Sequence, residues 1–183
     1  MNLILPETYQ PALDIKETEV AIKLVKDFFE RELAKNLNLT RVSAPLFVRP
    51  ESGLNDNLNG VERPVSFGIK EQNDHEVEIV HSLAKWKRHA LKRYGFAHGE
   101  GLYTDMNAIR RDEDTDNIHS IFVDQWDWEK IITKEERNFD TLQSVVSSVY
   151  DTLKATEQYM SAQYDYINPF LPDSITFITS QEL

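Results

Sequence analysis

The expected architecture is built on residues 102–128, which read LYTDMNAIRRDEDTDNIHSIFVDQWDW. The residues of Leu102–Arg110 and of Ile118–Trp128 alternate in polarity, and a period of two is typical of strands. The acidic stretch Arg111–Asn117 lies between the two runs. We therefore predict two long strands joined by a charged loop.

One face of each predicted strand carries polar groups among apolar ones. In the second strand that face holds Ile121, Val123, Gln125 and Asp127. In the first strand one face holds Thr104, Met106, Ala108 and Arg110. If the strands pair antiparallel, Arg110 can lie on the same floor as Gln125 or Asp127, although spacing does not fix the register. An Arg beside amide and carboxylate groups suits an anionic ligand, although a solvated strand end would show the same pattern.

The segment before residue 102 predicts helices, a hairpin and a long loop. A capping box at Asp14 and Glu17 opens a helix that ends near Leu37. A β-like segment follows and is interrupted by Pro45. The remaining predicted elements are the loop Glu51–Pro64, the hairpin strands Val65–Ile69 and Glu76–Val80, and the helix Leu83–Tyr94, capped by Ser82 and ended by Gly95.

The segment after residue 128 predicts a second long helix. Thr133 and Glu136 form a capping-box pattern, and apolar residues at helical spacing continue to Leu153. Ile175–Ile178 is typical of a short strand, and Ser180 of a helix cap. Together these patterns predict the α+β class, with a mostly antiparallel sheet flanked by helices. A helix cap so near the last residue leads us to expect a longer gene product.

Composition narrows the classes of function. The chain has 183 residues, 20 Lys and Arg, 31 Asp and Glu, and a formal net charge of −11. A negative field repels phosphate backbones, so we expect no nucleic-acid partner. No apolar run approaches the ~20 residues of a membrane span, so we expect no membrane partner. The absence of Cys excludes disulfides and a thiol nucleophile in this chain and fits a cytoplasmic location.

The segment Lys85–Arg93 concentrates five basic side chains in an acidic chain. Most of them are expected on a solvated helix face, while one or two could point into a pocket for a negative ligand. The His residues show no metal-binding spacing, and neither the phosphate-loop nor the dinucleotide-binding glycine motif occurs. Any ATP site therefore differs from both of those types.

Three runs of consecutive residues resemble the bacterial aspartate–ammonia ligase family, the ammonia-dependent asparagine synthetases of type A. These runs are His81–Arg88, Gly99–Thr104 and Val123–Glu129, and Ser180–Leu183 is similar as well. The resemblance extends from about residue 11 to the end. We therefore expect residues 1–10 to be an N-terminal arm and residues 11–183 to be the N-terminal portion of one synthetase-like catalytic domain.

The resemblance implies a core similar to that of class II aminoacyl-tRNA synthetases. The first helix and the strand up to Pro45 resemble motif 1, which builds a two-fold interface and implies a homodimer. The strands around the acidic loop, with Arg110 and later His119, resemble motif 2, which contacts the α-phosphate of ATP. Motif 3, a Gly-rich segment with an Arg, is expected beyond Leu183.

The resemblance also implies a reaction. L-Aspartate, ATP and ammonia, with Mg²⁺ present, would give L-asparagine, AMP and pyrophosphate through β-aspartyl-AMP. The implied catalytic residues are Asp56, Arg110 and Gln125, with Arg110 also binding the nucleotide, and the implied L-aspartate-binding residues are Ser82, Lys87 and Asp127. No metal ligand is assigned. The alternative is a catalytically silent synthetase-like module that binds an amino acid or AMP.

Overall fold

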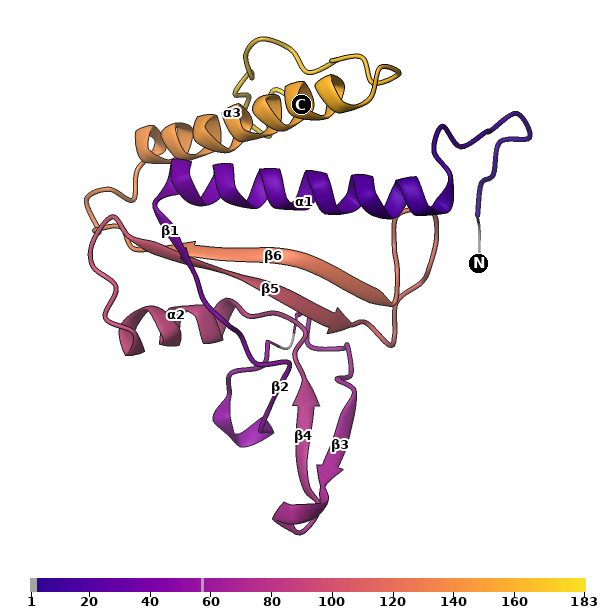
Figure 1. Cartoon of the computed structure of the whole chain (residues 1–183). Helices are drawn as coiled ribbons and strands as arrows, with labels where there is room; N and C mark the ends of the chain where they lie inside the picture. The colour runs from indigo at the N-terminus through magenta and orange to yellow at the C-terminus, as the bar shows by residue number, and fades with distance from the viewer. Residues whose placement is uncertain (1–2, 57) are drawn as a thin grey trace. The chain divides into compact units, whose positions relative to one another are not determined.

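Figure 1 shows the computed structural model of the chain, which describes residues 3–56 and 58–183. Residues 1–2 of the expected arm and Asn57 of the expected loop lie outside the described residues. The chain divides into two compact units. One contains Leu39–Ile131 and the described residues up to Tyr9, and the other contains Gln10–Asn38 and Ile132–Leu183.

The elements follow one another along the chain as helices alternating with short and long strands. In order they are α1 (Ile15–Leu37), β1 (Leu39–Arg41), β2 (Phe47–Val48), η1 (Pro50–Ser52), β3 (Ser66–Ile69), η2 (Lys70–Gln72), β4 (His75–Ile79), α2 (Ala84–Arg93), β5 (Gly101–Ile109), β6 (Phe122–Lys130) and α3 (Phe139–Gln163). The elements η1 and η2 are single 3₁₀ turns.

The two long strands predicted from residues 102–128 are confirmed as the antiparallel pair β5 and β6. Their register runs from Gly101 opposite Lys130 to Ile109 opposite Phe122. Strand β1 pairs parallel with the other edge of β5, which gives a three-stranded sheet of order β1-β5-β6 (Figure 1). The mostly antiparallel character of the expected sheet therefore holds, with β1 as the parallel exception.

Strand β6 begins at Phe122, later than the predicted Ile118. The Asp116 carboxylate accepts hydrogen bonds from the backbone N–H groups of Ile118 at 2.9 Å and His119 at 2.8 Å. Such an aspartate turn competes with strand pairing, because it uses backbone donors that a ladder would need. The loop between the long strands is consequently longer than the acidic stretch alone predicts.

The predicted hairpin is confirmed by β3 and β4. They pair antiparallel from Ser66 opposite Glu78 to Ile69 opposite His75, and β2 pairs with the other edge of β4. Asn73 and Asp74 occupy the left-handed region in the turn, with φ of 55° and 57°. Asn and Asp tolerate that region better than other non-glycine residues, which explains why this sequence reverses direction here.

Helix α2 and one face of the long sheet form the core of the first unit. The buried apolar residues of this core are Val48, Val80, Leu83, Trp86, Ala90, Leu91, Leu102, Met106 and Ala108. The last three occupy alternate positions of β5, as the period of two requires. This core fixes the sheet face that carries Arg110, Gln125 and Asp127.

In the second unit, α1 packs antiparallel to α3. The rings of Phe28 and Tyr159 stack with centroids 4.3 Å apart, and Asn36 Nδ2 donates to Thr152 Oγ1 at 2.9 Å. The predicted capping box of α1 is confirmed, because the Asp14 side chain accepts from the Glu17 N–H while the Glu17 side chain accepts from the Asp14 N–H.

Two predictions for the second unit are wrong in part. Thr133 and Glu136 form the reciprocal bonds of a capping box, but α3 begins later, at Phe139, where the Asn138 side chain accepts from the Thr141 N–H. Residues 175–178 form no strand in the described chain. Phe177 instead packs edge-on against Phe139, with ring centroids 6.2 Å apart.

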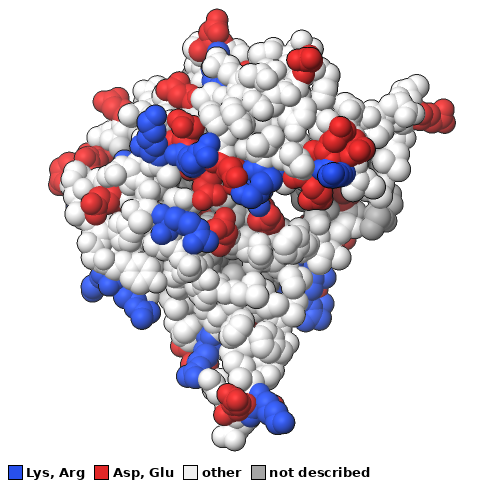
Figure 2. Space-filling view, viewed as in Figure 1, with Lys and Arg blue, Asp and Glu red and all other residues white. Residues whose placement is uncertain are grey.

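Charges of opposite sign are mixed on the visible surface. On the face that Figure 2 shows, Lys and Arg side chains lie among Asp and Glu side chains, and neither kind gathers into one broad area. None of the helices in the described part of the chain is long and apolar enough to cross a membrane.

Gly101 allows β1, β5 and β6 to approach one another closely. A Cβ at this position would lie 2.5 Å from Leu39 Cδ2 and 2.6 Å from the Glu129 carbonyl oxygen. Because a backbone oxygen cannot rotate away, Gly101→Ala should lower the free energy of unfolding by about 3 kcal/mol, at the upper end of overpacking costs. Urea denaturation of the whole protein should show a lower midpoint.

Gly60→Ala is the matched control for this prediction. Gly60 has φ of +85°, and no atom of the described residues lies within 4 Å of an added Cβ, so Ala there meets backbone strain without a collision. A midpoint shift in Gly101→Ala no larger than that in Gly60→Ala would show that the three strands separate to accommodate the methyl group.

Candidate functional site

The polar residues of the long strands lie on one sheet face, at different levels. Thr104 is opposite Asp127 and Met106 is opposite Gln125, while the Arg110 N–H donates to the Ile121 carbonyl at 2.7 Å just beyond the strand. Four residues of β-strand span about 13 Å, so the Arg110 backbone is that far from the level of Gln125. The antiparallel pairing thus places Arg110, Gln125 and Asp127 on one sheet face. Arg110 and Gln125 can contact each other only if both side chains extend along that face.

Lys87 joins helix α2 to the end of β6. Its side chain is 5% exposed, and its ammonium group contacts the Asp127 carboxylate and donates to the Trp128 carbonyl at 2.9 Å. The Glu129 carboxylate lies 3.6 Å from the same nitrogen. Burying an ammonium group is costly unless it is paired, and these acceptors provide the pairing. Two predicted substrate-binding residues, Lys87 and Asp127, are therefore in direct contact.

Gln125 lies further along the same face. Its Nε2 lies 3.7 Å from the Met106 sulfur, a weak acceptor, and the side chain is partly exposed. The amide therefore keeps most of its hydrogen-bonding capacity for a ligand on this face.

Ser82 precedes α2 but does not cap it in the predicted way. The helix begins at Ala84 with Leu83 at the N-cap position, and the Ser82 hydroxyl accepts from the Ala84 N–H at 3.2 Å. The bond spans two residues, as in a serine turn, because Leu83 already has a nearly helical backbone with ψ of 11°. Ser82 is half-buried at this helix start.

Asn55 anchors the long loop that carries Asp56. Asn55 is 7% exposed, and its side-chain oxygen accepts from the backbone N–H groups of His81 at 2.9 Å and Asp56 at 3.1 Å. The Asn55 Nδ2 donates to Glu78 Oε2 at 3.0 Å, and the Asn55 backbone carbonyl accepts from Lys85 Nζ at 3.1 Å. The half-buried Asp56 is therefore connected through one amide to the segment that holds Ser82.

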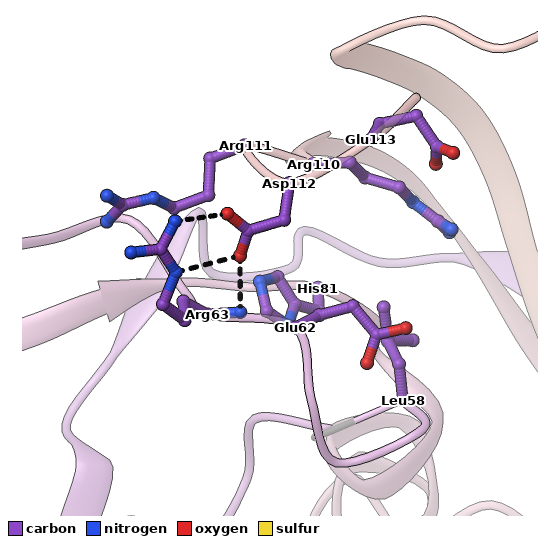
Figure 3. A pocket seen from close by; sticks show the side chains of 8 residues that line it. All are labelled: Leu58, Glu62, Arg63, His81, Arg110, Arg111, Asp112 and Glu113. Atoms are coloured by element: carbon purple, nitrogen blue, oxygen red, sulfur yellow. Dashed lines mark hydrogen bonds and ion pairs between the residues drawn. The ribbon is translucent and has the colours of Figure 1, made fainter. Parts of the chain in front are cut away.

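A cavity of about 90 Å³ lies where this loop meets the loop between β5 and β6 (Figure 3). The lining residues are Leu58, Glu62, Arg63, His81, Arg110, Arg111, Asp112 and Glu113. Arg110 Nε is buried there without a hydrogen-bond partner in the described chain. Since each water occupies ~30 Å³ in the liquid, the cavity has room for a group the size of a phosphate.

Arg63 and Asp112 face each other at this cavity and form an ion pair. Arg63 Nε donates to Asp112 Oδ2 at 3.1 Å, its Nη2 contacts Oδ1, and its backbone N–H donates to Oδ2 at 3.0 Å. These bonds from Arg63 hold the pKa of the Asp112 carboxyl far below its usual value, and the same carboxylate raises the pKa of Arg63. Both groups are thus charged at neutral pH.

His119 and Asp116 form a second pair in the loop between the long strands. His119 Nδ1 lies 2.9 Å from Asp116 Oδ1. This hydrogen bond raises the pKa of His119, while hydrogen bonds from the Ile118 N–H and from His119 lower the pKa of Asp116. The pair stabilises the local turn that delays β6, and His119 does not line the cavity.

The donor groups around the cavity favour an anionic ligand. Arg110 offers a buried N–H group that no described residue accepts, and Arg111 lies beside it in the chain. An unpaired buried donor costs free energy until an acceptor arrives, and a phosphate oxygen is such an acceptor. Among the described residues, no group of three or more His, Asp or Glu is placed to hold a metal ion.

Sequence reasoning missed Asn55, Arg63 and Asp112. Asn55 lies in a loop rich in Asn and Gly, where every Asn is typical of a turn, so its burial gave no signal. Arg63 and Asp112 are 49 positions apart and pair only in the folded chain. The burial of Lys87 did have a signal, because Leu83, Lys87, Ala90 and Leu91 recur at helical spacing.

Comparison with known proteins identifies close relatives. A family model described as aspartate–ammonia ligase matches residues 16–183. An aspartate–ammonia ligase of Clostridium perfringens (strain 13 / Type A) is 69% identical over 182 residues, which cover 100% of this chain and 54% of the relative. An aspartate–ammonia ligase of Ruminiclostridium cellulolyticum is 67% identical over 182 residues, which again cover 100% of this chain and 54% of the relative. The chain therefore spans about half the length of the curated relatives it matches.

Among solved structures, an asparaginyl-tRNA synthetase of Entamoeba histolytica matches with a TM-score of 0.51. The match covers 86% of this chain and 33% of that chain at 12% identity, so it concerns the fold alone. The α+β fold resembles the catalytic core of class II aminoacyl-tRNA synthetases, as expected.

Proposed function

The chain belongs to the aspartate–ammonia ligase family, and from that premise we propose that the whole protein makes L-asparagine from L-aspartate, ammonia and ATP. The observation that carries the proposal in this chain is Arg110, whose buried Nε has no acceptor among the described residues at a cavity of phosphate size. We further propose that the active protein is a homodimer and works in the cytoplasm, and that residues 11–183 form part of one catalytic domain.

Activation of L-aspartate is the first chemical step of the proposal. A carboxylate is a poor acyl donor because its leaving group would be oxide. Attack of the side-chain carboxylate on the α-phosphorus of ATP forms a carboxyl–phosphate bond, breaks the bond to the β-phosphate and releases pyrophosphate. Arg110 would neutralise charge that develops on the α-phosphate oxygens, and Gln125 would hold the reacting carbonyl or phosphate oxygen. Mg²⁺ would accompany ATP and offset its phosphate charge, and no ligand of it is assigned to this chain.

Amide formation is the second step. Neutral ammonia attacks the acyl carbon of β-aspartyl-AMP and the carbon–nitrogen bond forms. The bond from that carbon to the phosphate oxygen breaks, AMP leaves, and the new nitrogen loses one proton to solvent. Ammonium must lose a proton first, and Asp56 is the proposed acceptor. This role needs a carboxylate, and the Asp56 carboxylate is free of hydrogen bonds to the described residues.

Recognition of the amino acid is assigned to Ser82, Lys87 and Asp127. Asp127 suits the α-ammonium group and Lys87 suits the α-carboxylate. Because these two side chains already contact each other, a bound zwitterion would extend one ion pair into an alternating set of four charges. The Ser82 hydroxyl would complete the site by hydrogen bonding.

The products test this proposal. The whole protein, given L-aspartate, ammonium and ATP, should release AMP and pyrophosphate in equal amounts with L-asparagine. Chromatography of the nucleotides after reaction measures this directly. Release of ADP and phosphate would contradict attack at the α-phosphate, and binding of AMP or L-aspartate without turnover would favour the silent module. Glutamine should not replace ammonium, because the proposed second step uses free ammonia.

A further inference from the structure

Arg63 and Asp112 join two loops that the proposed chemistry uses separately. Arg63 ends the loop that carries Asp56, and Asp112 follows Arg110 by two positions in the loop between β5 and β6. Donors from the Arg63 guanidinium and its backbone N–H engage both oxygens of the Asp112 carboxylate (Figure 3). Arg111 Nη1 adds a longer hydrogen bond of 3.4 Å to the Pro64 carbonyl. Each of the two loops therefore donates hydrogen bonds to the other.

The geometry of this pair differs from that of an ordinary surface ion pair. An exposed single-contact pair contributes little to stability, and Arg63 keeps 67% of its side chain exposed. Here, however, a planar fork and a main-chain donor act on one carboxylate, so the direction of approach is defined as well as the charge. The contact fixes where two chain segments lie rather than holding the fold together.

The Asp56 loop is restrained at both of its ends. At its start, Asn55 binds the backbone of His81 and the side chain of Glu78. At its end, Arg63 binds Asp112. In Figure 3 the Arg110 side chain points away from the ion pair, so that pair leaves the Arg110 guanidinium available to a ligand.

We propose that the Arg63–Asp112 pair couples the two loops and sets the position of Asp56 relative to Arg110, which makes Arg63 a positioning residue for asparagine synthesis. This inference rests on the proposed function for its catalytic consequence. The coupling of the loops is a property of the chain itself and has its own readout.

The experiment is a double-mutant cycle in the whole protein. Arg63→Ala should lower kcat roughly two- to fivefold, the upper part of the range for an exposed pair. Asp112→Ala should do the same, and the double variant should be no slower than either single variant, because each change removes the same contact. Arg63→Lys should recover part of the loss, since it keeps the positive charge that Arg63→Ala removes.

Arg41→Ala is the matched control. Arg41 also donates through Nε and Nη2 to an aspartate, Asp105, at 3.2 and 2.8 Å, but this pair lies on β1 and β5. Arg41→Ala should leave kcat unchanged. Equal kcat values in Arg63→Ala and Arg41→Ala, or additive losses in the cycle, would overturn the proposal.

Hydrogen exchange separates failure of this inference from failure of the proposed function. In Arg63→Ala, backbone amides of residues 58–63 and 111–121 should exchange faster together, whereas Arg41→Ala should leave them unchanged. If the wild-type protein makes no asparagine, the proposed function and the positioning role both fail, while faster exchange would still support the coupling. Unchanged exchange would overturn the coupling whatever the activity.

Discussion

Arg110→Lys in the whole protein is expected to lower the rate of the adenylation half-reaction about a hundredfold, the scale on which loss of one charge-stabilising donor acts. Lys keeps the positive charge but replaces a planar fork by a single ammonium group. The structure shows why the fork matters: Arg110 Nε is buried at the cavity and lacks a partner among the described residues. A lysine has one ammonium nitrogen. It cannot donate both from the position of Arg110 Nε and from the positions of the Nη atoms to the oxygens of one phosphate.

Exchange of labelled pyrophosphate into ATP, in the presence of L-aspartate, measures this half-reaction. Thermal unfolding should change little, because Arg110 lies beyond the end of β5 and only its backbone N–H takes part in the sheet. Arg41→Lys, on the exposed edge of the same sheet, is the control for a general effect of such a replacement. Wild-type exchange in Arg110→Lys would place Arg110 among structural residues.

The sequence predicted the architecture where local patterns determine it. Alternation along residues 102–110 placed Thr104, Met106 and Ala108 on one face, and the structure buries all three. The capping box at Asp14 located the start of α1 to the residue. These features depend on a few neighbours in sequence, so no knowledge of the fold was needed.

The sequence could not predict features that depend on distant contacts. The position of the loop before β6 is one such feature, because the Asn117 side chain exchanges two hydrogen bonds of 2.8 Å with the Ile4 backbone, 113 residues away. The failure of the predicted strand at residues 175–178 has the same origin, since Phe177 packs against Phe139 of α3.

The candidate site also has features that local sequence patterns predict and features that depend on distant contacts. The shared face of Arg110, Gln125 and Asp127 followed from alternation, and antiparallel pairing confirmed it. The contact between Lys87 and Asp127 did not follow, because it requires α2 to lie over the end of β6. Catalytic roles for Asp56, Arg110 and Gln125 remain predictions, which the variants of Arg110 and Asp56 address.

Asp56→Asn is expected to slow asparagine formation about a hundredfold at low ammonium, within the range for loss of a general base, and to leave pyrophosphate exchange nearly unchanged. Ammonium is abundant at neutral pH, yet only neutral ammonia has the lone pair that attacks the acyl carbon. A carboxylate near that carbon draws ammonium in and accepts its proton. Asn has nearly the same shape without the charge, so it keeps the loop and loses both effects.

The position of Asp56 allows an experiment to distinguish a proton acceptor from a residue that only stabilises the turn. Its backbone N–H is bonded to the Asn55 side chain at 3.1 Å, so the loop conformation does not depend on the Asp56 carboxylate. If Asp56 is only a turn residue, Asn should serve equally well, because both residue types favour turns. Asp74→Asn is the matched control for that case, since Asp74 occupies a left-handed turn position with φ of 57°.

Two assays on the same variant then give three distinct outcomes. Loss of synthesis with retained exchange assigns Asp56 to the ammonia step. A parallel loss of synthesis and exchange would instead place Asp56 in the binding of L-aspartate or ATP, because both half-reactions need those ligands. Synthesis equal to that of wild type and of Asp74→Asn would remove Asp56 from the site. We expect the first outcome, because Asn55 holds this half-buried residue beside the segment that carries Ser82, while its carboxylate bonds to no described residue.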